Sequence, residues 1–171
     1  SKDPEYITNG HLVKTARMPI PNKKTGEKQG AYMIRCVPQM MQYHDKSEAI
    51  AICYRSFQGK MINLETYNDY PQSVSNNAKK VLRWRDKYGD DVKGMTRVGW
   101  VRANQLAKRE NISRETIARM SAFRRHQKNA EVSAEFKDTP WKDKGYVAWL
   151  GWGGTTGINW ASKKLQQIDN K

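Results

Sequence analysis

The stretch Arg97–Lys128, RVGWVRANQLAKRENISRETIARMSAFRRHQK, decides the fold that the sequence predicts. Apolar residues recur at helical spacing on both sides of a short polar break, which indicates two helices joined by a tight connection. In the first helix, Val98, Val101 and Leu106 lie near one face, so we expect this face to contact the core.

The second helix of this hairpin has a start signal at Ser113. A serine hydroxyl in this position accepts a hydrogen bond from a free amide of the first turn. Ile112 and Ile117 lie on either side of the cap with the spacing of a hydrophobic staple. Ile117, Met120 and Phe123 then follow at helical intervals, so they should face the core.

The outward positions of the hairpin are mostly positive, since the stretch holds nine Lys and Arg side chains against two Glu. Its outline is that of a helix-turn-helix with Ser113–Lys128 as the recognition helix, which would enter the major groove of DNA. The turn lacks the usual glycine, and a solvated basic face without a partner is the alternative. The residues predicted to bind nucleic acid are Arg97, Trp100, Arg102, Lys108, Arg109, Arg114, Arg119, Arg124, Arg125 and Lys128.

The charge of the whole chain indicates a polyanionic partner. The 171 residues carry a formal net charge of +14, and six Trp, eight Tyr and three Phe supply apolar surface for a core. Residues 1–71 hold ten basic and seven acidic side chains, whereas residues 72–171 hold 21 basic and 10 acidic ones. We therefore assign polyanion binding to the C-terminal part, with DNA favoured over RNA and an acidic protein surface as the alternative.

The order of apolar patterns and breaks predicts a mainly α-helical protein. A small helical hairpin should precede a compact multi-helix module that contains the helix-turn-helix-like hairpin and at most one short strand. The predicted parts are a flexible N-terminal segment at 1–30, the small hairpin at 31–57, a linker at 58–74 and the basic helical module at 75–171.

Two helices are predicted in the small hairpin. The first should end near Val37, because Pro38 disfavours helix in the residue before it. The second should begin at Ser47, a plausible N-cap. Its expected inward stripe is Ala49, Ile50, Cys53 and Phe57. Before the hairpin, residues 11–18 are predicted to form a short strand.

The basic module should open with a helix over 75–88, which Gly89 would end. After the central hairpin, residues 129–144 are polar and predict a long connection. The apolar run 146–150 predicts either a short strand or a helical turn, and the glycines of 151–157 predict a tight turn. The inward stripe of a last helix is Ile158, Ala161, Leu165 and Ile168.

The cysteines and histidines give little support for a metal site. Cys36, His44 and Cys53 match no zinc spacing, and no fourth ligand is evident. We expect the two cysteines to pack as free, buried thiols in a reduced environment, with a disulfide between facing helices as the alternative. We therefore expect neither a metal ion nor a cofactor.

Two other patterns each have a structural and a functional interpretation. The glycine turn Gly151–Gly157 precedes a helix and could cradle phosphate, but no lysine takes the place of the Walker lysine, so we favour a structural turn. Among the tryptophans, Trp149 and Trp160 are expected in the core. Trp100 and Trp141 lie in more polar surroundings and are better candidates for base stacking at the surface.

No catalytic site is predicted. The histidines His11, His44 and His126 lie in no recognisable catalytic setting, and no paired-carboxylate, triad or metallohydrolase motif is present. An enzyme acting on nucleic acid is therefore the least favoured function. The sequence also lacks a run of the roughly 18 apolar residues that a membrane span requires, and no secretory signal is visible, so we expect no membrane partner.

Two parts of the sequence resemble proteins of tailed bacteriophages. The first is YMIRCVPQMMQYHDKSEAIAICYRSF (32–57), which resembles a short phage segment with an aromatic–Met–x–Arg–Cys start and an Ala–x–Cys–Tyr helix end. The second lies within 77–161, with the landmarks AKKVLRWRDKYG, VGWVRANQLAKRENISRETIARMSAFRRHQKN and GYVAWLGWGGTTGINWA. Similar proteins often carry another bulky apolar residue at the position of Gly151 and an Asp at that of Thr155, so the chain departs from the pattern there.

This resemblance implies a phage origin and a role in the virion or in genome handling. Some proteins with such segments accompany head or capsid-maturation proteins. We therefore expect a phage-encoded protein that binds nucleic acid mainly through phosphate contacts, in the host cytoplasm during infection or packaged in the virion. The alternative is a phage assembly or interaction protein whose basic face binds an acidic capsid protein or another phage protein.

Overall fold

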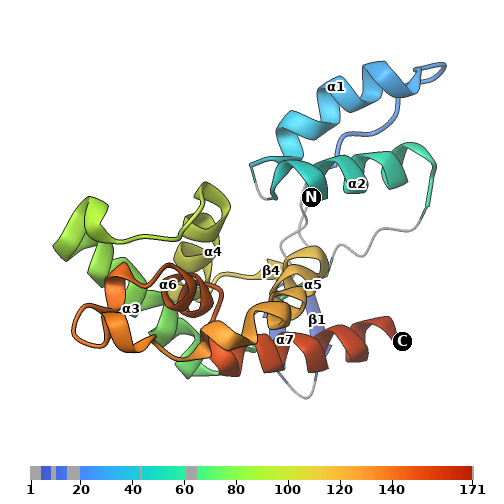
Figure 1. Cartoon of the computed structure of the whole chain (residues 1–171). Coiled ribbons are helices and arrows are strands. Elements are labelled where there is room, and N and C mark those ends of the chain that lie inside the picture. Colours follow the sequence, from blue (N-terminus) through green and yellow to red (C-terminus); the bar gives the residue numbers. More distant parts are fainter. Residues whose placement is uncertain (1–4, 9–10, 15–19, 43, 61–64, 171) are drawn as a thin grey trace. The chain divides into compact units, whose positions relative to one another are not determined.

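A computed structural model describes residues 5–8, 11–14, 20–42, 44–60 and 65–170 (Figure 1). The chain divides into two compact units, Ser1–Thr66 and Tyr67–Lys171, and the division falls inside the predicted linker. Seven α-helices dominate the described residues, which confirms the mainly α class. We refer to the two parts as the N-terminal and the C-terminal unit.

The N-terminal unit consists of a helical hairpin and a short sheet. Helix α1 (Gln29–Met40) packs against α2 (Lys46–Phe57), and the strands β1 (Glu5–Thr8) and β2 (His11–Lys14) pair antiparallel. The strand predicted at 11–18 is thus present over its first four residues, while the rest of that stretch lies outside the described residues. The N-terminal segment predicted to be flexible therefore contains regular structure.

Helix α1 continues past the residue at which the sequence predicted its end. Pro38 lies inside the helix, which extends to Met40 and buries that side chain completely. The amide that Pro38 lacks would donate to the carbonyl of Ile34, four residues earlier. Ile34 and Pro38 both lie on the exposed side of the helix, where water can bind that carbonyl, so the prediction of an end near Val37 is wrong.

Helix α2 differs from the prediction at its start and in its inward stripe. Its N-cap is Asp45 and not Ser47, because the Asp45 carboxylate accepts a hydrogen bond from the amide of Glu48 at 2.8 Å. Ile50 is exposed, and Ile52 is buried in its place. The predicted positions Ala49, Cys53 and Phe57 do pack in the core of this hairpin, so the stripe is wrong only at Ile50.

Cys36 and Cys53 form a disulfide that joins α1 to α2, and both residues are fully buried. Their Cα atoms lie 5.9 Å apart, because the two helices face each other at these positions. The expectation of free thiols is therefore wrong, and the alternative of a disulfide is correct.

The remaining candidate ligand, His44, is buried with its Nδ1 3.0 Å from Glu48 Oε2. Within the described ranges, no group of three or more His, Cys, Asp or Glu could hold a metal ion.

The C-terminal unit holds the other five helices, and a second short sheet includes the boundary between the units. These helices are α3 (Gln72–Tyr88), α4 (Arg97–Ala107), α5 (Arg114–Ala122), α6 (Lys144–Gly151) and α7 (Gly154–Asp169). The strand β3 (Thr66–Tyr67) pairs with β4 (Ile112–Ser113). The short 3₁₀ helices are η1 (Gly89–Asp91), η2 (Phe123–Ala130), η3 (Ala134–Phe136) and η4 (Pro140–Lys142).

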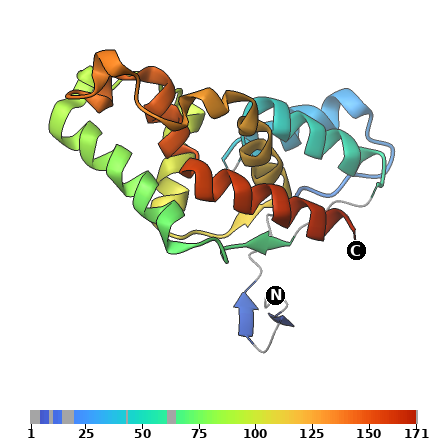
Figure 2. The same cartoon turned by 60° about the horizontal axis from the view of Figure 1, so that its bottom comes forward.

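The two helices of the central hairpin have different main partners. Helix α4 packs chiefly against α3, whereas α5 packs chiefly against α7. Figures 1 and 2 both show α5 and α7 side by side. The central hairpin is therefore braced from two sides. None of the described helices is long and apolar enough to cross a membrane.

Several local predictions in this unit are confirmed and others are wrong. Ser113 caps α5 by accepting from the amide of Thr116, and Ile112 and Ile117 are buried. Gly89 ends α3 with a φ of +55°. Val101, however, is 40% exposed, and the run 146–150 belongs to helix α6, which excludes the strand alternative. The main core contains Tyr70, Val74, Leu106, Ile117, Met120, Trp152 and Ala161.

The glycine turn before α7 has a structural role. Gly153 and Gly154 have φ values of +108° and +68°, a region that favours glycine. Asn77 of α3 donates from Nδ2 to the carbonyl of Gly153 at 3.0 Å. A Cβ on Gly154 would lie 2.3 Å from that Nδ2, so the turn lets α3 approach closely. This geometry supports the structural interpretation of the turn over a phosphate cradle.

We expect the disulfide to account for much of the stability of the N-terminal unit. It links residues 17 positions apart, and a loop of that size corresponds to about 3 kcal/mol in the chain-entropy description. Reducing the full chain should therefore speed amide exchange in α1 and α2 by about a hundredfold. Peptides from α3 to α7 should be unchanged, which provides an internal control in hydrogen-exchange mass spectrometry. Equal protection of α1 and α2 in the alkylated, reduced protein would contradict this expectation.

Candidate nucleic-acid interface

The ten residues predicted to bind nucleic acid separate into a buried, a bonded and an exposed set. Arg102 belongs to the first, with only 1% of its surface exposed. Its Nη1 donates to Gln105 Oε1 at 2.6 Å and to Thr116 Oγ1 at 3.1 Å. Its guanidinium carbon lies 5.3 Å from the centroid of the Trp152 ring. The prediction that Arg102 faces outward is therefore wrong, because these partners hold the charge inside the unit.

Arg109 occupies the turn between α4 and α5 in a left-handed conformation. It is the one non-glycine residue with positive φ in the part of the chain that the structure describes, at +54°. The side chain donates to Ser75 Oγ at 3.0 Å, and to the carbonyl oxygens of Tyr70 at 2.5 Å and Asn68 at 3.3 Å. The half-buried Arg109 thus takes the conformation of the missing turn glycine and ties the turn to the start of α3.

Arg114, the first residue of α5, forms a fork with the carboxylate of Asp169 at the end of α7. Its Nε and Nη2 donate to the two carboxylate oxygens at 2.8 and 2.9 Å. The hydrogen bond from Arg114 lowers the pKa of Asp169, so this carboxyl is ionised at neutral pH. Arg114 is therefore bonded within the protein and is not available to phosphate unless Asp169 releases it.

The exposed side of α4 carries fewer cations than predicted. Arg97 and Lys108 are exposed at the two ends of the helix, with the exposed Val101 between them. Trp100 is half-buried against the small core of Val81, Val147 and Leu150. The guanidinium of Arg85 lies 4.3 Å from the Trp100 ring centroid, so one face of this ring is already covered.

Helix α5 is shorter than the predicted recognition helix. It ends at Ala122, and the chain continues as η2 with a kink at His126, where φ and ψ are −100° and 22°. The exposed residues Arg124, Arg125 and Lys128 therefore lie on η2 and not on a continuous helix. Exposed Arg119 remains on α5.

The exposed cations of η2 lie beside α7, and we group them with the exposed Lys163 of α7 as the η2–α7 surface. Arg124 donates from Nη2 to Asn159 Oδ1 of α7 at 2.9 Å. Lys163 is exposed one helical turn beyond Asn159, on the same side of α7. The η2–α7 surface consists of Arg124, Arg125, Lys128 and Lys163.

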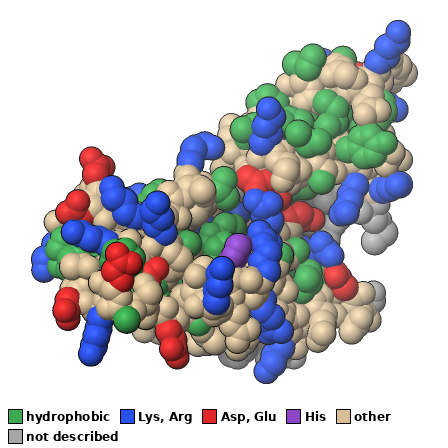
Figure 3. Space-filling model, in the orientation of Figure 1, with side chains coloured by type: hydrophobic (Ala, Val, Ile, Leu, Met, Phe, Trp, Pro, Cys, Tyr) green, Lys and Arg blue, Asp and Glu red, His purple; other side chains and the backbone are tan. Residues whose placement is uncertain are grey.

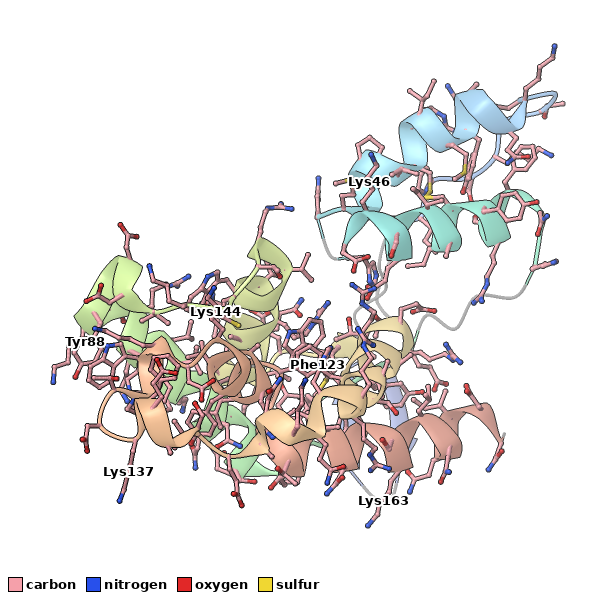
Figure 4. The ribbon with its side chains drawn as sticks, viewed as in Figure 1. Lys46, Tyr88, Phe123, Lys137, Lys144 and Lys163 are labelled. Atoms are coloured by element: carbon pink, nitrogen blue, oxygen red, sulfur yellow. A yellow bond between two sulfur atoms is a disulfide. The ribbon has the colours of Figure 1, made fainter. Side chains whose placement is uncertain are left out.

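These four cations have no acidic partner among the described residues. Figure 3 shows blue side chains gathered over this part of the C-terminal unit, whereas blue and red alternate toward its other end. In Figure 4, Lys163 lies well apart from Lys137, Lys144 and Tyr88, which occupy that other end. On the face that Figure 3 shows, cations are therefore less interspersed with acidic side chains here than toward the other end of the unit.

The remaining tryptophans pack against other rings. Trp149 is buried as predicted, and Trp160 is half-buried with its ring edge toward Tyr70. Trp141 stacks on Tyr88 with ring centroids 3.8 Å apart, so one of its faces is occupied. The rings therefore contribute mainly to packing, and the surface available for base stacking is small.

Sequence reasoning missed Lys163 and the polar contacts between α5 and α7. Ser121 and Ser162 lie with their hydroxyl oxygens 2.9 Å apart, and Asn159 accepts from Arg124. The last helix showed only its inward stripe in the sequence. A helical projection of that stripe would have placed Asn159 and Lys163 together on the opposite side, but not next to η2.

The chain was compared with protein-family models, curated proteins and solved structures, and none of them matches.

We expect the Arg109 side chain to stabilise the C-terminal unit although its backbone is strained. Arg109→Gly removes the strain of the left-handed conformation but loses the side-chain hydrogen bonds, so the free energy of unfolding should fall by about 1–2 kcal/mol. Arg109→Ala loses the bonds and keeps the strain, so it should be less stable than Arg109→Gly by about 1 kcal/mol. Urea unfolding followed by tryptophan fluorescence tests this, because all six Trp lie in the C-terminal unit.

The neighbouring exposed residue provides the control for this series. Lys108→Ala should change the free energy of unfolding by less than about 0.5 kcal/mol. The account of the turn is wrong if Arg109→Gly is as stable as the wild type, or if the Ala variant equals the Gly variant.

Proposed function

We propose that the protein binds nucleic acid through its C-terminal unit, mainly by contacts between exposed cations and phosphates. The observation that carries this proposal is the η2–α7 surface, four exposed Lys and Arg side chains that form no ion pair with a carboxylate in the described structure. Unpaired cations attract counter-ions, and their release on binding to a phosphate backbone favours association. A binding mode of this kind depends on salt and little on base sequence.

The proposal extends to the biological setting that the phage resemblance implies. A sequence-independent DNA binder suits a phage protein that accompanies the genome into the virion or acts during packaging. The net charge of +14 supports this, since such a protein must associate with a dense polyanion. DNA is the favoured partner and RNA the second.

The salt dependence of binding tests the proposal. If the η2–α7 surface neutralises four phosphates, the logarithm of the association constant for a duplex should fall with log salt at a slope of about −3.6. Replacing Arg124, Arg125 and Lys128 together with Gln should reduce that slope to about −0.9. Fluorescence anisotropy with a labelled duplex of mixed sequence measures both slopes.

A second triple variant of equal charge provides the matched control. Arg83, Lys137 and Lys142 are exposed cations outside the η2–α7 surface, and their replacement with Gln removes the same three charges. This control should keep nearly the wild-type slope. Equal effects of the two triple variants would mean that net charge and not this surface determines binding, and the absence of wild-type binding at low salt would refute the proposed function.

Exposed apolar side chains on the N-terminal unit favour a second candidate function, that of a phage assembly or interaction protein. Ile34 is 77% exposed on α1, and Ile50 and Tyr54 are exposed one helical turn apart on α2. Figure 3 shows hydrophobic side chains gathered on the visible face of this unit. Apolar groups clustered on a small surface are typical of protein contacts. In this alternative the basic C-terminal unit would bind an acidic protein partner, and excess duplex DNA would leave that complex intact.

A further inference from the structure

Three contacts define how α5 and α7 run past each other. Arg114 bonds to Asp169, the Ser121 hydroxyl lies against the Ser162 hydroxyl, and Arg124 bonds to Asn159. From one contact to the next, the residue number rises along α5 and η2 by as much as it falls along α7. The two helices are therefore antiparallel and in register along their whole shared length. We name the outward edge of this contact the α5–α7 seam.

The seam has an Arg side chain at each end and an uncharged middle, and Arg114 at one end is paired with Asp169. Helical periodicity places two further residues on the same edges as the bonded ones, Ala118 on α5 and Gln166 on α7. Both are accessible, Ala118 in part and Gln166 fully. The middle thus offers small or polar side chains, and the amide groups of Asn159 and Gln166 can donate to oxygen. The Ser162 hydroxyl donates to the carbonyl of Ile158 and accepts from Ser121. The residues that line the seam are Arg114, Ala118, Ser121, Arg124, Asn159, Ser162, Gln166 and Asp169.

The length of the seam suits an extended anionic polymer. Arg114 and Arg124 are ten residues apart along α5 and the start of η2. At the rise per residue of these helices, their Cα atoms are separated by about 15 Å. Phosphates along one strand of a duplex advance about 3.4 Å each, so a few of them span this distance. The Arg124 end of the seam adjoins the η2–α7 surface, which continues the positive charge beyond it.

The carboxylate of Asp169 occupies the position that a phosphate would take at the other end. An Arg fork binds the two oxygens of a carboxylate and those of a phosphate in the same planar geometry. Asp169 is largely exposed, and an anionic side chain at the C-terminal end of a helix is disfavoured by the helix dipole. Its contribution to folding is therefore small, and its main effect is to hold and neutralise Arg114.

We propose that the sugar–phosphate backbone of the bound nucleic acid lies along the α5–α7 seam, and that Asp169 competes with phosphate for Arg114. The inference rests on the proposed function, and adds to it the path of the strand and an acidic residue that limits affinity. The path runs from the η2–α7 surface, past the serine hydroxyls, to Arg114. Binding then requires the Arg114 fork to exchange a carboxylate for a phosphate.

Isosteric substitutions that change one charge each test this path. Asp169→Asn frees Arg114, so affinity for the labelled duplex at about 0.1 M salt should rise about five- to tenfold, and the salt slope should steepen by about 0.9. Asp138→Asn adds the same charge at an exposed position outside the seam and should change affinity less than twofold. A double variant, Asp169→Asn with Arg114→Gln, should lose the gain.

A second pair of variants places a negative charge in the seam without involving Asp169. Gln166→Glu should weaken binding several-fold, whereas Gln72→Glu, at an exposed position of α3 outside the seam and outside the η2–α7 surface, should have little effect. If the wild type binds duplex but neither pair separates its seam variant from its control, the path is wrong and the proposed function stands. If the wild type does not bind duplex at all, both proposals fail.

Discussion

The buried guanidinium of Arg102 is the interaction on which the C-terminal unit depends. It joins three parts of the chain, since it extends from α4, donates to Thr116 of α5 and lies against Trp152 in the turn before α7. A charge inside a protein is costly unless hydrogen bonds and polarisable groups surround it. The cap of α5 contributes to the same network, because the Ser113 hydroxyl donates to the Thr116 oxygen that Arg102 also contacts. The N-cap of α5, the buried charge of Arg102 and the packing of Trp152 therefore depend on one another.

This constraint divides the cations of the central hairpin by role. Arg102 and Arg109 hold α4, α5 and the start of α3 together, and Arg114 joins α5 to the end of α7. Cations further along, on η2, remain exposed beside α7. A high count of Lys and Arg in a segment thus overstates the charge that a partner can use. The unit can pack well despite its excess of positive charge, because several of its Arg side chains form hydrogen bonds within the protein.

Most helices could be predicted from the sequence, but the burial and the bonding partners of individual side chains could not. Apolar periodicity found the helices of both units except α6, which the sequence left open between a strand and a helical turn. The local signals at Ser113 and Gly89 found two helix ends. Arg102 was assigned to the surface because of its charge, although the spacing from Val98 and to Leu106 places it on the apolar face. Its partners Thr116 and Trp152 are distant in sequence. Pro38 and the Cys36–Cys53 bond were mispredicted for a related reason, since the packing of α1 on α2 decides both. The exposed cations of η2 were found, whereas Lys163 required the register of α5 against α7.

The most direct test of this account is the free energy of unfolding of Arg102→Lys, measured by urea titration with tryptophan fluorescence. Lysine keeps the charge but cannot reproduce the planar guanidinium that bonds to Thr116 and packs on Trp152. The account predicts a loss of about 2 kcal/mol, set against a change below about 0.5 kcal/mol for the exposed Arg97→Lys on the same helix. A stability of Arg102→Lys within about 0.5 kcal/mol of the wild type would contradict the central role of the buried guanidinium.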